Sequence, residues 1–322
     1  MKKFGETDLM TSQIVYGCMG GAGAFGKQEE SDSLQALQQA FDVGINFFDT
    51  AEAYGDGYSE QLLGRALGSQ RSEIVFSSKV AEQNAAPTQI AMACERSLKN
   101  LGTDFIDLYM LHWPNRKVPL ADSIGALEEL KHQGKIRWYG VSNFGYNDLD
   151  DALALGEVSV NQLPYHLFSR AIEFEVQPKC QAEGVPIMCY SSLMQGLLAG
   201  KYRSLDDFPA SRARTRMFDH RKWAEVVHTE NGAEHAGQAL LDALWDIVEQ
   251  TEYSMEELAI GWLKSRPAVG GVIVGTRNAQ QSQGLKKLID VTLDEPLLHA
   301  LSTASDRLKE ELGSDIDMWG KG

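Results

Sequence analysis

The sequence lacks the features that mark secreted, metal-binding and membrane-spanning proteins. Lysines at positions 2 and 3 are not followed by the apolar stretch of a secretory signal, and no apolar run approaches the ~18 residues that a membrane-spanning helix needs. We therefore expect a cytoplasmic protein. Its few cysteines form no C-x-x-C pair and no ligand spacing with histidine, so we expect no metal site and reduced, mostly buried thiols. The four are Cys18, Cys94, Cys180 and Cys189.

Basic residues are scarce as well. The chain has 30 lysines and arginines against 45 aspartates and glutamates, for a formal net charge of -15. An acidic protein repels phosphate backbones and anionic lipid, so neither nucleic acid nor a membrane surface is an expected partner. A hydrophobic content of 43% allows a large core, and 322 residues suit one (β/α)8 barrel, which routinely takes ~250 residues or more. We expect residues 1–322 to form a single domain.

Short apolar runs alternate with helical patterns along most of the chain. In residues 33–43, for example, Leu34, Leu37 and Phe41 share one helix face, and a glycine follows where a left-handed cap ends a helix. Further helices are predicted at 89–101 and 124–133. The glycines after the three helices are Gly44, Gly102 and Gly134, and the predicted strands are 14–16, 46–48, 74–77, 106–110, 137–141, 159–161, 186–189 and 271–274.

This alternation predicts an α/β fold with a parallel sheet. Eight strand–helix units favour a closed (β/α)8 TIM barrel over an open sheet. A doubly wound dinucleotide-binding fold is the alternative, and it expects G-x-G-x-x-G between a strand and a helix. The glycines within 17–23 imitate this motif in part, but no helix begins at the right distance.

Two regions depart from the regular alternation. Little periodicity is present from Tyr190 to about Leu240, which predicts a long loop after the seventh strand, and long loops in compact domains are usually functional. Residues 295–311 predict an extra C-terminal helix, and residues 315–322 are expected to be a loose tail.

Polar side chains leave three successive predicted strands at one end of the barrel. Asp49 ends the second strand and is followed in the next segment by Tyr54. Lys79 ends the third strand, and His112 follows the fourth. Taken singly, these residues are explained as a cap, a packed loop tyrosine, a solvent-reaching lysine and a turn histidine. Their joint placement at the carboxyl ends of the strands, where barrel enzymes carry their active sites, favours one shared site.

The types of these side chains suit carbonyl chemistry. A carboxylate would hold a desolvated lysine charged, and the lysine would lower the pKa of a nearby tyrosine from its usual ~10. Such a tyrosine can act as a general acid, and a neutral histidine can orient a carbonyl oxygen. Together these groups would stabilise the alkoxide that develops when a carbonyl accepts hydride.

Several segments resemble the signatures of the aldo-keto reductase superfamily. They are DTAEAYG at 49–55, LHWP at 111–114 and YGVSNF at 139–144, and SEQLLG at 59–64 resembles the prokaryotic branches and the potassium-channel β-subunit relatives. The resemblance covers nearly the whole chain. It implies a TIM-barrel oxidoreductase that uses NADPH (NADP+) to reduce aldehydes and ketones, including sugar-like ones, to alcohols. The implied catalytic tetrad is Asp49, Tyr54 as proton donor, Lys79 and His112.

The resemblance also implies where NADPH binds. Ser142, Asn143 and Gln162 would bind the carboxamide, and Tyr190 would stack on the nicotinamide. Arg277 would hold the adenosine 2′-phosphate, for which a guanidinium is suited by its bidentate geometry. The full implied set is Gly17, Cys18, Met19, Asp49, Ser142, Asn143, Gln162, Tyr190, Ser191, Leu193, Gly196, Leu197, Gly200, Lys201, Gly275, Thr276, Arg277 and Gln281.

The chain departs from the family pattern at four positions. Ser192 and Val274 stand where the family often has proline. Gly284 and Leu285 stand where the family often has a Glu–Asn pair that contacts the adenine amino group. We expect the loss of this pair to weaken the affinity for the cofactor. The 2′-phosphate contacts remain, so the expected cofactor is NADPH and not NADH.

Residues 211–222 concentrate five basic side chains in an otherwise acidic protein. Three interpretations are open: a solvated loop, a lid that clamps the cofactor phosphates, and a pocket for an anionic substrate group. Arg212, Arg214 and Arg216 alternate, so an extended backbone would point them the same way.

Three functions are compatible with these patterns and with the resemblance, although the third, a plain scaffold, gives no reason for Lys79 to lie beside Asp49 at a barrel mouth. The first is an enzyme that acts on a small-molecule carbonyl substrate. The alternative is a cofactor-binding, redox-sensing auxiliary protein on the same fold. The complete tetrad favours the enzyme.

Overall fold

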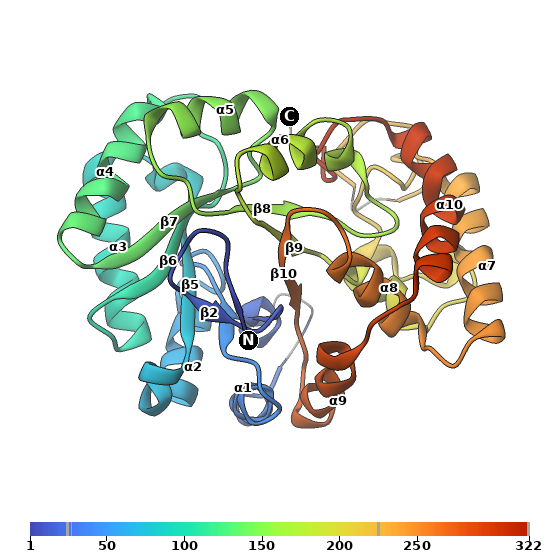
Figure 1. Cartoon of the computed structure of the whole chain (residues 1–322), viewed down its shortest axis with the longest axis horizontal. Coiled ribbons are helices and arrows are strands. Elements are labelled where there is room, and N and C mark those ends of the chain that lie inside the picture. The colour runs from blue at the N-terminus through green and yellow to red at the C-terminus, as the bar shows by residue number, and fades with distance from the viewer. Residues whose placement is uncertain (24–25, 27, 224–225, 321–322) are drawn as a thin grey trace.

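The computed structural model describes residues 1–23, 26, 28–223 and 226–320, in which eight parallel strands close into a barrel (Figure 1). The last strand pairs with the first of the eight, with Val272 opposite Ile14, so this sheet has no free edge. The predicted TIM barrel is confirmed. In chain order the strands are β3 (Ile14–Gly17), β4 (Phe47–Asp49), β5 (Val75–Val80), β6 (Ile106–Leu111), β7 (Ile136–Ser142), β8 (Asn161–Pro164), β9 (Ile187–Tyr190) and β10 (Val269–Val274).

One strand lies later than its apolar run predicts. The expected strand at 159–161 is observed as β8, which begins at Asn161 and ends at Pro164. Gln162 and Leu163 belong to it because they pair with Met188 and Cys189 of β9. The neighbouring strand decides these limits, and the sequence of β8 alone does not contain that information.

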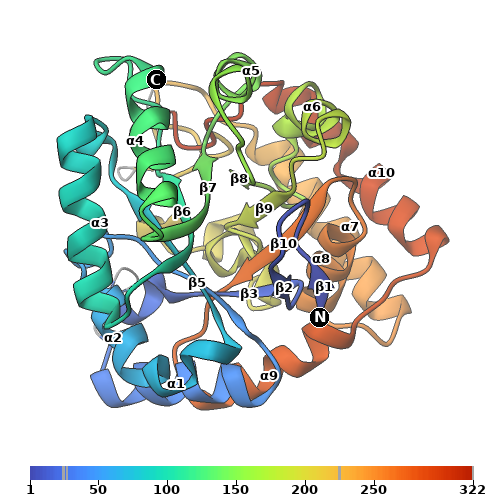
Figure 2. The same cartoon turned by 60° about the vertical axis from the view of Figure 1, so that its left-hand side comes forward.

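Helices surround the strands on the outside of the barrel (Figure 2). The predicted helices are confirmed, and the glycines after three of them have left-handed φ values of 103° (Gly44), 64° (Gly102) and 74° (Gly134). No helix in the described ranges combines the length and apolar character that crossing a membrane requires. The helices are α1 (Glu30–Asp42), α2 (Tyr58–Leu67), α3 (Pro87–Leu101), α4 (Leu120–His132), α5 (Tyr146–Leu155), α6 (Val176–Ala182), α7 (Glu234–Gln250), α8 (Met255–Lys264), α9 (Ala279–Asp290) and α10 (Glu295–Leu312), with short 3-10 turns η1 (Cys18–Ala22), η2 (Gly68–Glu73), η3 (Glu82–Asn84), η4 (Ala171–Glu173), η5 (Met194–Ala199), η6 (Leu205–Asp207) and η7 (Ala210–Arg212).

A short hairpin closes the end of the barrel where the strands begin, which we call the floor. It consists of β1 (Lys2–Lys3) and β2 (Met10–Thr11), and its Phe4 and Leu9 are buried. The Phe4 ring meets the Phe47 ring edge-on, with centroids 5.4 Å apart. The two apolar side chains plug the floor, so the opposite end, which we call the mouth, is left for polar groups.

The long loop and the extra C-terminal helix form as predicted, but the chain end is not loose. The loop follows β9 and leads to α7, and α10 packs beside α7. Beyond α10, the residues 313–320, which we call the C-terminal tail, return across the mouth. Met318 of the tail is buried, and its carbonyl accepts a hydrogen bond from the Arg216 backbone N–H at 2.8 Å. Positions 321 and 322 lie outside the described residues.

Candidate active site at the barrel mouth

The four polar residues singled out from the sequence lie together at the mouth. Asp49 is the last residue of β4, Lys79 lies one residue before the end of β5, and His112 directly follows β6. Tyr54 lies in the loop between β4 and α2, and its ring meets the His112 ring edge-on with centroids 5.7 Å apart. The structure therefore brings the whole predicted tetrad into one site.

Lys79 is the most deeply buried member, with no exposed side-chain surface. Its ammonium donates hydrogen bonds to Asp49 Oδ2 at 2.7 Å and to the Thr50 carbonyl at 2.6 Å. The Tyr54 hydroxyl lies 3.4 Å from the same Nζ. A lysine has three N–H donors, and each has an acceptor here. The ammonium is thus fixed directly beneath the tyrosine hydroxyl.

Asp49 is held in turn by the neighbouring strand β5 and by β8 from across the barrel. Its Oδ1 accepts hydrogen bonds from Ser77 Oγ and from Gln162 Nε2, both at 3.0 Å. Together with the lysine contact on Oδ2, these bonds engage both oxygens of a carboxylate that is only 3% exposed. The carboxylate can therefore neutralise Lys79 without leaving a buried charge unpaired.

Burial and charge act in opposite directions on the two proton carriers. Burial lowers the pKa of Lys79, but Asp49 and Tyr54 outweigh it, and the net pKa lies above its usual value. Burial raises the pKa of Tyr54 above 10, and Lys79 opposes this only in part. The predicted net lowering of the Tyr54 pKa is therefore wrong for the protein alone, because desolvation of the phenolate exceeds the effect of the ammonium. Both groups are protonated at neutral pH.

Two side chains near its start anchor the loop that carries Tyr54. Thr50 Oγ1 donates to Ser59 Oγ at 2.8 Å, which ties the start of the loop to α2. Glu52 accepts from the Ala81 backbone N–H at 2.8 Å and pairs with Arg96 at 2.9 Å. These contacts fix the loop against β5 and α3, so the position of the tyrosine is set by the barrel.

A second group of predicted residues lies beside the tetrad. Ser142 ends β7, Gln162 lies in β8, and Tyr190 ends β9. Asn143 directly follows β7 in a left-handed conformation (φ 63°), and its Nδ2 donates to the His112 carbonyl at 3.0 Å. The Tyr190 hydroxyl donates to Asn143 Oδ1 at 2.8 Å. These side chains form one connected polar surface across three strands.

The loop after β9 has unusual backbone geometry. Ser191, Met194, Gln195 and Gly196 all have positive φ values, which are uncommon for residues other than glycine. The Gln195 side-chain Nε2 is buried and has no hydrogen-bond partner. Backbone strain and an orphaned donor at one place are typical of a ligand-binding segment. This segment contains the predicted cofactor residues Ser191, Leu193, Gly196, Leu197, Gly200 and Lys201.

The predicted phosphate-binding segment after β10 is only partly available to a ligand. Thr276 is 9% exposed, and its hydroxyl is engaged by Tyr16 at 3.0 Å and Ser282 at 2.6 Å. The Thr276 hydroxyl is therefore already engaged within the protein, and the implied role of this residue in binding the 2′-phosphate stays a prediction. Arg277 is exposed next to the start of α9, and Gln281 accepts from its backbone N–H at 2.8 Å.

The remaining cofactor candidates differ in exposure. Gly17, at the end of β3, and Met19, in η1, face outward in part, whereas Cys18 is buried. Gly275 lies against the Gly17 carbonyl, where a Cβ on residue 275 would stand 2.9 Å from that oxygen. The four cysteines are all buried, as predicted.

Three of the four family departures lie in the packed interior. Ser192 is buried, and its hydroxyl donates to the Cys189 carbonyl at 3.1 Å, so it ties the loop to β9 where the family often has proline. Val274 and Leu285 are buried, whereas Gly284 is exposed. Leu285 therefore serves the core, and its side chain is not directed to a ligand.

The arginines of the loop do not point the same way. Arg212 ends the turn η7 and donates to the Gln195 carbonyl at 3.3 Å. Arg216 pairs with Glu230 at 2.6 Å and with Asp315 of the C-terminal tail at 3.4 Å. The extended backbone that would align the arginines is not observed, because Arg212 ends a 3-10 turn and a hydrogen-bonded turn joins Thr215 to Phe218. Of the three arginines, Arg212 lies against the strained loop and Arg216 holds the tail.

Sequence reasoning missed three contributors to this site. Ser77 alternates along β5 with the lysine, and this two-residue spacing was a usable signal. Gln28 binds Arg277, with its Oε1 3.2 Å from the Arg277 Nε, and no local pattern marks it. Trp319 of the tail donates its indole N–H to the Tyr190 hydroxyl at 3.1 Å, although the tail was expected to be loose. The Gln28–Arg277 and Trp319–Tyr190 contacts each join segments far apart in the sequence.

The mouth can supply a proton beside a fixed positive charge. The Tyr54 hydroxyl carries a transferable proton and lies next to the Lys79 ammonium, and the His112 ring offers a second polar group beside it. Among the residues that the structure describes, no three histidine, cysteine, aspartate or glutamate side chains are grouped so as to hold a metal ion.

Comparisons with known proteins agree with this geometry. A model of the aldo/keto reductase family matches residues 13–304. The aldo-keto reductase YhdN of Bacillus subtilis is 31% identical over 304 residues, which cover 90% of this chain and 88% of that protein. The NADH-specific methylglyoxal reductase of Escherichia coli is 28% identical over 338 residues, which cover 95% of this chain and 100% of that protein.

A solved structure shows the same likeness in three dimensions. The aldo/keto reductase of Klebsiella pneumoniae, solved in complex with NADP and acetate, superposes with a TM-score of 0.70 at 28% identity. The match covers 90% of both chains.

Proposed function

The chain belongs to the aldo/keto reductase family, and on that premise we propose that it is an NADPH-dependent oxidoreductase that reduces aldehydes and ketones to alcohols. The observation that carries the proposal is the buried Lys79–Asp49 pair, whose ammonium lies 3.4 Å from the Tyr54 hydroxyl. A fixed ammonium beside a phenol is suited to proton transfer to a carbonyl oxygen.

The residues at the mouth fit a nicotinamide dinucleotide. Asn143 Oδ1 has a second lone pair available to an amide N–H, since Tyr190 uses only one. The buried, unpartnered Gln195 Nε2 supplies a donor in the strained loop, as a pyrophosphate requires. Arg277 stands beside the N-terminus of α9, where backbone N–H groups favour an anion. When bound, such a cofactor supplies the hydride.

The protein residues supply the proton and hold its charge. The raised pKa keeps Tyr54 protonated at neutral pH, so the hydroxyl is ready to donate. As the proton leaves, Lys79 stabilises the developing phenolate, and Asp49 keeps the lysine in place. His112, in edge contact with the tyrosine ring, is positioned to orient the same carbonyl oxygen. The net result is one proton delivered to the carbonyl oxygen beside a buried positive charge.

The choice of NADPH over NADH rests on Arg277. One relative is named as NADH-specific and one solved neighbour binds NADP, so family membership does not decide between the two cofactors. An exposed guanidinium at a helix N-terminus favours the additional phosphate. We also propose that the whole chain acts as one domain, since the N-terminal hairpin and the C-terminal tail close opposite ends of one barrel.

Tyr54→Phe tests the proposal. With methylglyoxal and glyceraldehyde as substrates, we expect kcat to fall ~100-fold or more, the usual scale for loss of a general acid, while the Kd for NADPH stays within a few-fold. Tyr58→Phe is the matched control, because its hydroxyl donates to Glu30 on the surface at 2.7 Å. A Tyr54→Phe protein with the wild-type rate would contradict the assignment. Wild-type protein that binds NADPH but never turns over would favour the redox-sensing alternative.

A further inference from the structure

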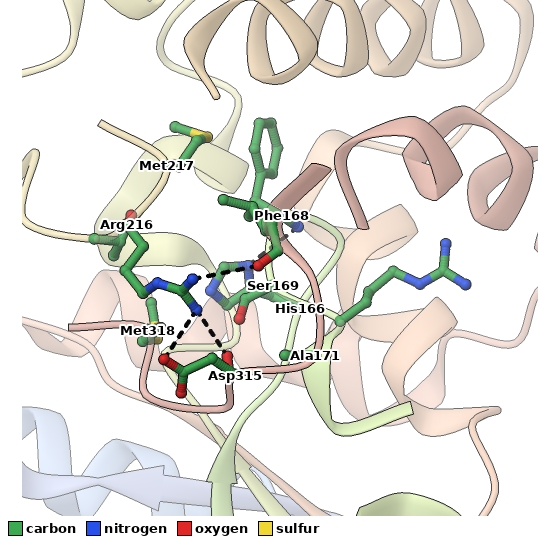
Figure 3. Close-up of a pocket in the computed structure, with 11 residues that line it drawn as sticks. His166, Phe168, Ser169, Ala171, Arg216, Met217, Asp315 and Met318 are labelled. Atoms are coloured by element: carbon green, nitrogen blue, oxygen red, sulfur yellow. Dashed lines mark hydrogen bonds and ion pairs between the residues drawn. The ribbon is translucent and has the colours of Figure 1, made fainter. Parts of the chain in front are cut away.

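The C-terminal tail is bound to the mouth by three separate contacts. The first is Arg216, whose side chain is 13% exposed and whose Nη1 donates to the Asp315 carbonyl at 3.1 Å (Figure 3). The second is Met318, buried and bonded through its carbonyl to the Arg216 backbone N–H. The third is Gly320, whose φ of 64° and missing Cβ allow the His228 side chain to lie against it. The tail is therefore anchored on both sides of Trp319.

Trp319 extends a chain of hydrogen bonds that ends at the tetrad. Its indole N–H donates to the Tyr190 hydroxyl at 3.1 Å, and that hydroxyl donates to Asn143 Oδ1 at 2.8 Å. The Asn143 amide in turn donates to the His112 carbonyl at 3.0 Å. All donors point in one direction, so each bond polarises and strengthens the next.

The middle of this chain is under conformational constraint. Asn143 has a left-handed backbone (φ 63°), which is held only when surrounding contacts fix it. Tyr190 reaches Asn143 from β9 across β8, and its ring orientation depends on what holds its hydroxyl. Burial raises the pKa of Tyr190, so this hydroxyl stays protonated and can donate to Asn143.

We propose that Trp319 is a positioning residue of the active site: its indole N–H fixes the Tyr190 hydroxyl, and through it Asn143, in the arrangement that binds the nicotinamide end of the cofactor. The inference rests on the proposed function. It makes the docked tail a part of the cofactor site, although Trp319 itself acts only through Tyr190. A tail that detaches would leave Tyr190 and Asn143 free to reorient.

A double-mutant cycle tests this role, with Trp319→Phe, Tyr190→Phe and the double variant. Trp319→Phe keeps an aromatic ring and removes one neutral hydrogen bond, so we expect the Kd for NADPH, measured by fluorescence titration, to rise about 2- to 10-fold. In the Tyr190→Phe background the same change should raise the Kd less than about 1.5-fold, because the acceptor hydroxyl is already gone. Trp138→Phe is the control, since its N–H donates to Asp8 at the floor at 2.8 Å.

Gly320→Ala provides a second route to the same result. A Cβ on residue 320 would lie 2.4 Å from the His228 Cβ, so the tail tip must shift. The substitution changes the position of the tail but leaves the side chains of Trp319 and Tyr190 chemically unaltered. We expect a rise in the NADPH Kd similar to that of Trp319→Phe, together with faster hydrogen exchange in the tail.

Three outcomes would overturn the inference. They are an unchanged NADPH Kd in Trp319→Phe, a full effect of that change in the Tyr190→Phe background, or a higher aldehyde KM with no change in the NADPH Kd. The last would make the indole a part of the substrate wall. Wild-type protein that fails to bind NADPH overturns the proposed function instead, and this result is read before any variant is compared.

Discussion

The two ends of the barrel each bury a carboxylate beside basic side chains, but they use it differently. At the floor, Asp107 is 1% exposed, pairs with Arg71 and Arg137 at 2.8 Å each, and accepts from the Phe76 backbone N–H. At the mouth, Asp49 pairs with Lys79, whose ammonium also faces the Tyr54 hydroxyl. The floor cluster pairs its carboxylate only with arginines and a backbone N–H, which stabilise the fold. The mouth cluster also includes a tyrosine hydroxyl, whose proton can be transferred.

Left-handed backbone is more frequent around the mouth than at the floor of the described barrel. Around the mouth, Asn143, Ser191, Met194 and Gln195 have left-handed φ values, and Gln195 keeps an unpartnered buried donor. The floor is plugged by Phe4 and Leu9, which pack without polar atoms. Burial of a charge alone therefore does not identify a site. Left-handed backbone and an unpartnered buried donor also occur at the floor, at Ala268 (φ 61°) and Arg266 Nε, so the mouth is distinguished by having its strained residues beside the tetrad.

The largest expected effect separates the two carboxylates. Asp49→Asn should lower kcat ~100-fold or more, because Lys79 loses its counter-ion beside the proton donor. Asp107→Asn should leave kcat within about twofold but lower the free energy of unfolding by about 3 kcal/mol, since two arginines lose their shared partner. Turnover and urea denaturation on both variants would measure the contrast. An equal loss of kcat in both variants would contradict the assignment of catalysis to Asp49 and of stability to Asp107.

A smaller effect, on the free energy of unfolding, is expected in acid. Its source is a histidine at the mouth that is buried and neutral in the folded protein. Burial lowers the pKa of His166 to about 3, and its Nε2 is unpartnered beside a cavity of about 20 Å³ that also contacts Thr215, Arg216 and Asp315. Below pH ~6.5 the unfolded chain binds a proton that the folded protein does not, so the free energy of unfolding falls as the pH drops from ~6.5 to about 3.

His166→Asn should remove this acid sensitivity. Asparagine can keep an acceptor near Nδ1, which receives the Phe168 backbone N–H at 3.2 Å, but it cannot be protonated. At pH 4.5 the wild type should lose about 2 to 3 kcal/mol relative to pH 8 beyond what the variant loses. Denaturation at pH 8, where the imidazole is neutral in both states, gives the cost of the substitution itself. Parallel pH curves for the two proteins would rule out His166 as the acid-sensitive group.

The smallest of the three effects concerns the rim of the mouth. Arg277→Ala should weaken NADPH binding about 10- to 100-fold and leave NADH binding nearly unchanged, because only NADPH carries the phosphate that the guanidinium would pair with. Arg137→Ala at the floor is the control and should change neither affinity. Fluorescence titration with both cofactors measures it. An equal loss for NADPH and NADH would place Arg277 away from the 2′-phosphate.

The sequence by itself determined the barrel and most of the tetrad. Strand–helix alternation, the glycine caps at Gly44, Gly102 and Gly134, and polar residues at the ends of strands are all local patterns. In a parallel barrel the carboxyl ends of the strands meet at one face, so local patterns are sufficient to place Asp49, Lys79 and His112 together.

Tertiary structure alone decided the features that depend on contact between distant segments. The limits of β8 were set by its pairing with β9, and the hydroxyl of Thr276 was turned inward by Tyr16 and Ser282. The net pKa of Tyr54 rises because burial, which no residue pattern reports, outweighs the charge that the sequence does show. The tail is ordered because Arg216, about a hundred positions earlier, supplies hydrogen bonds and an ion pair to it. Desolvation and long-range pairing depend on the packed whole, so a single sequence leaves them undetermined.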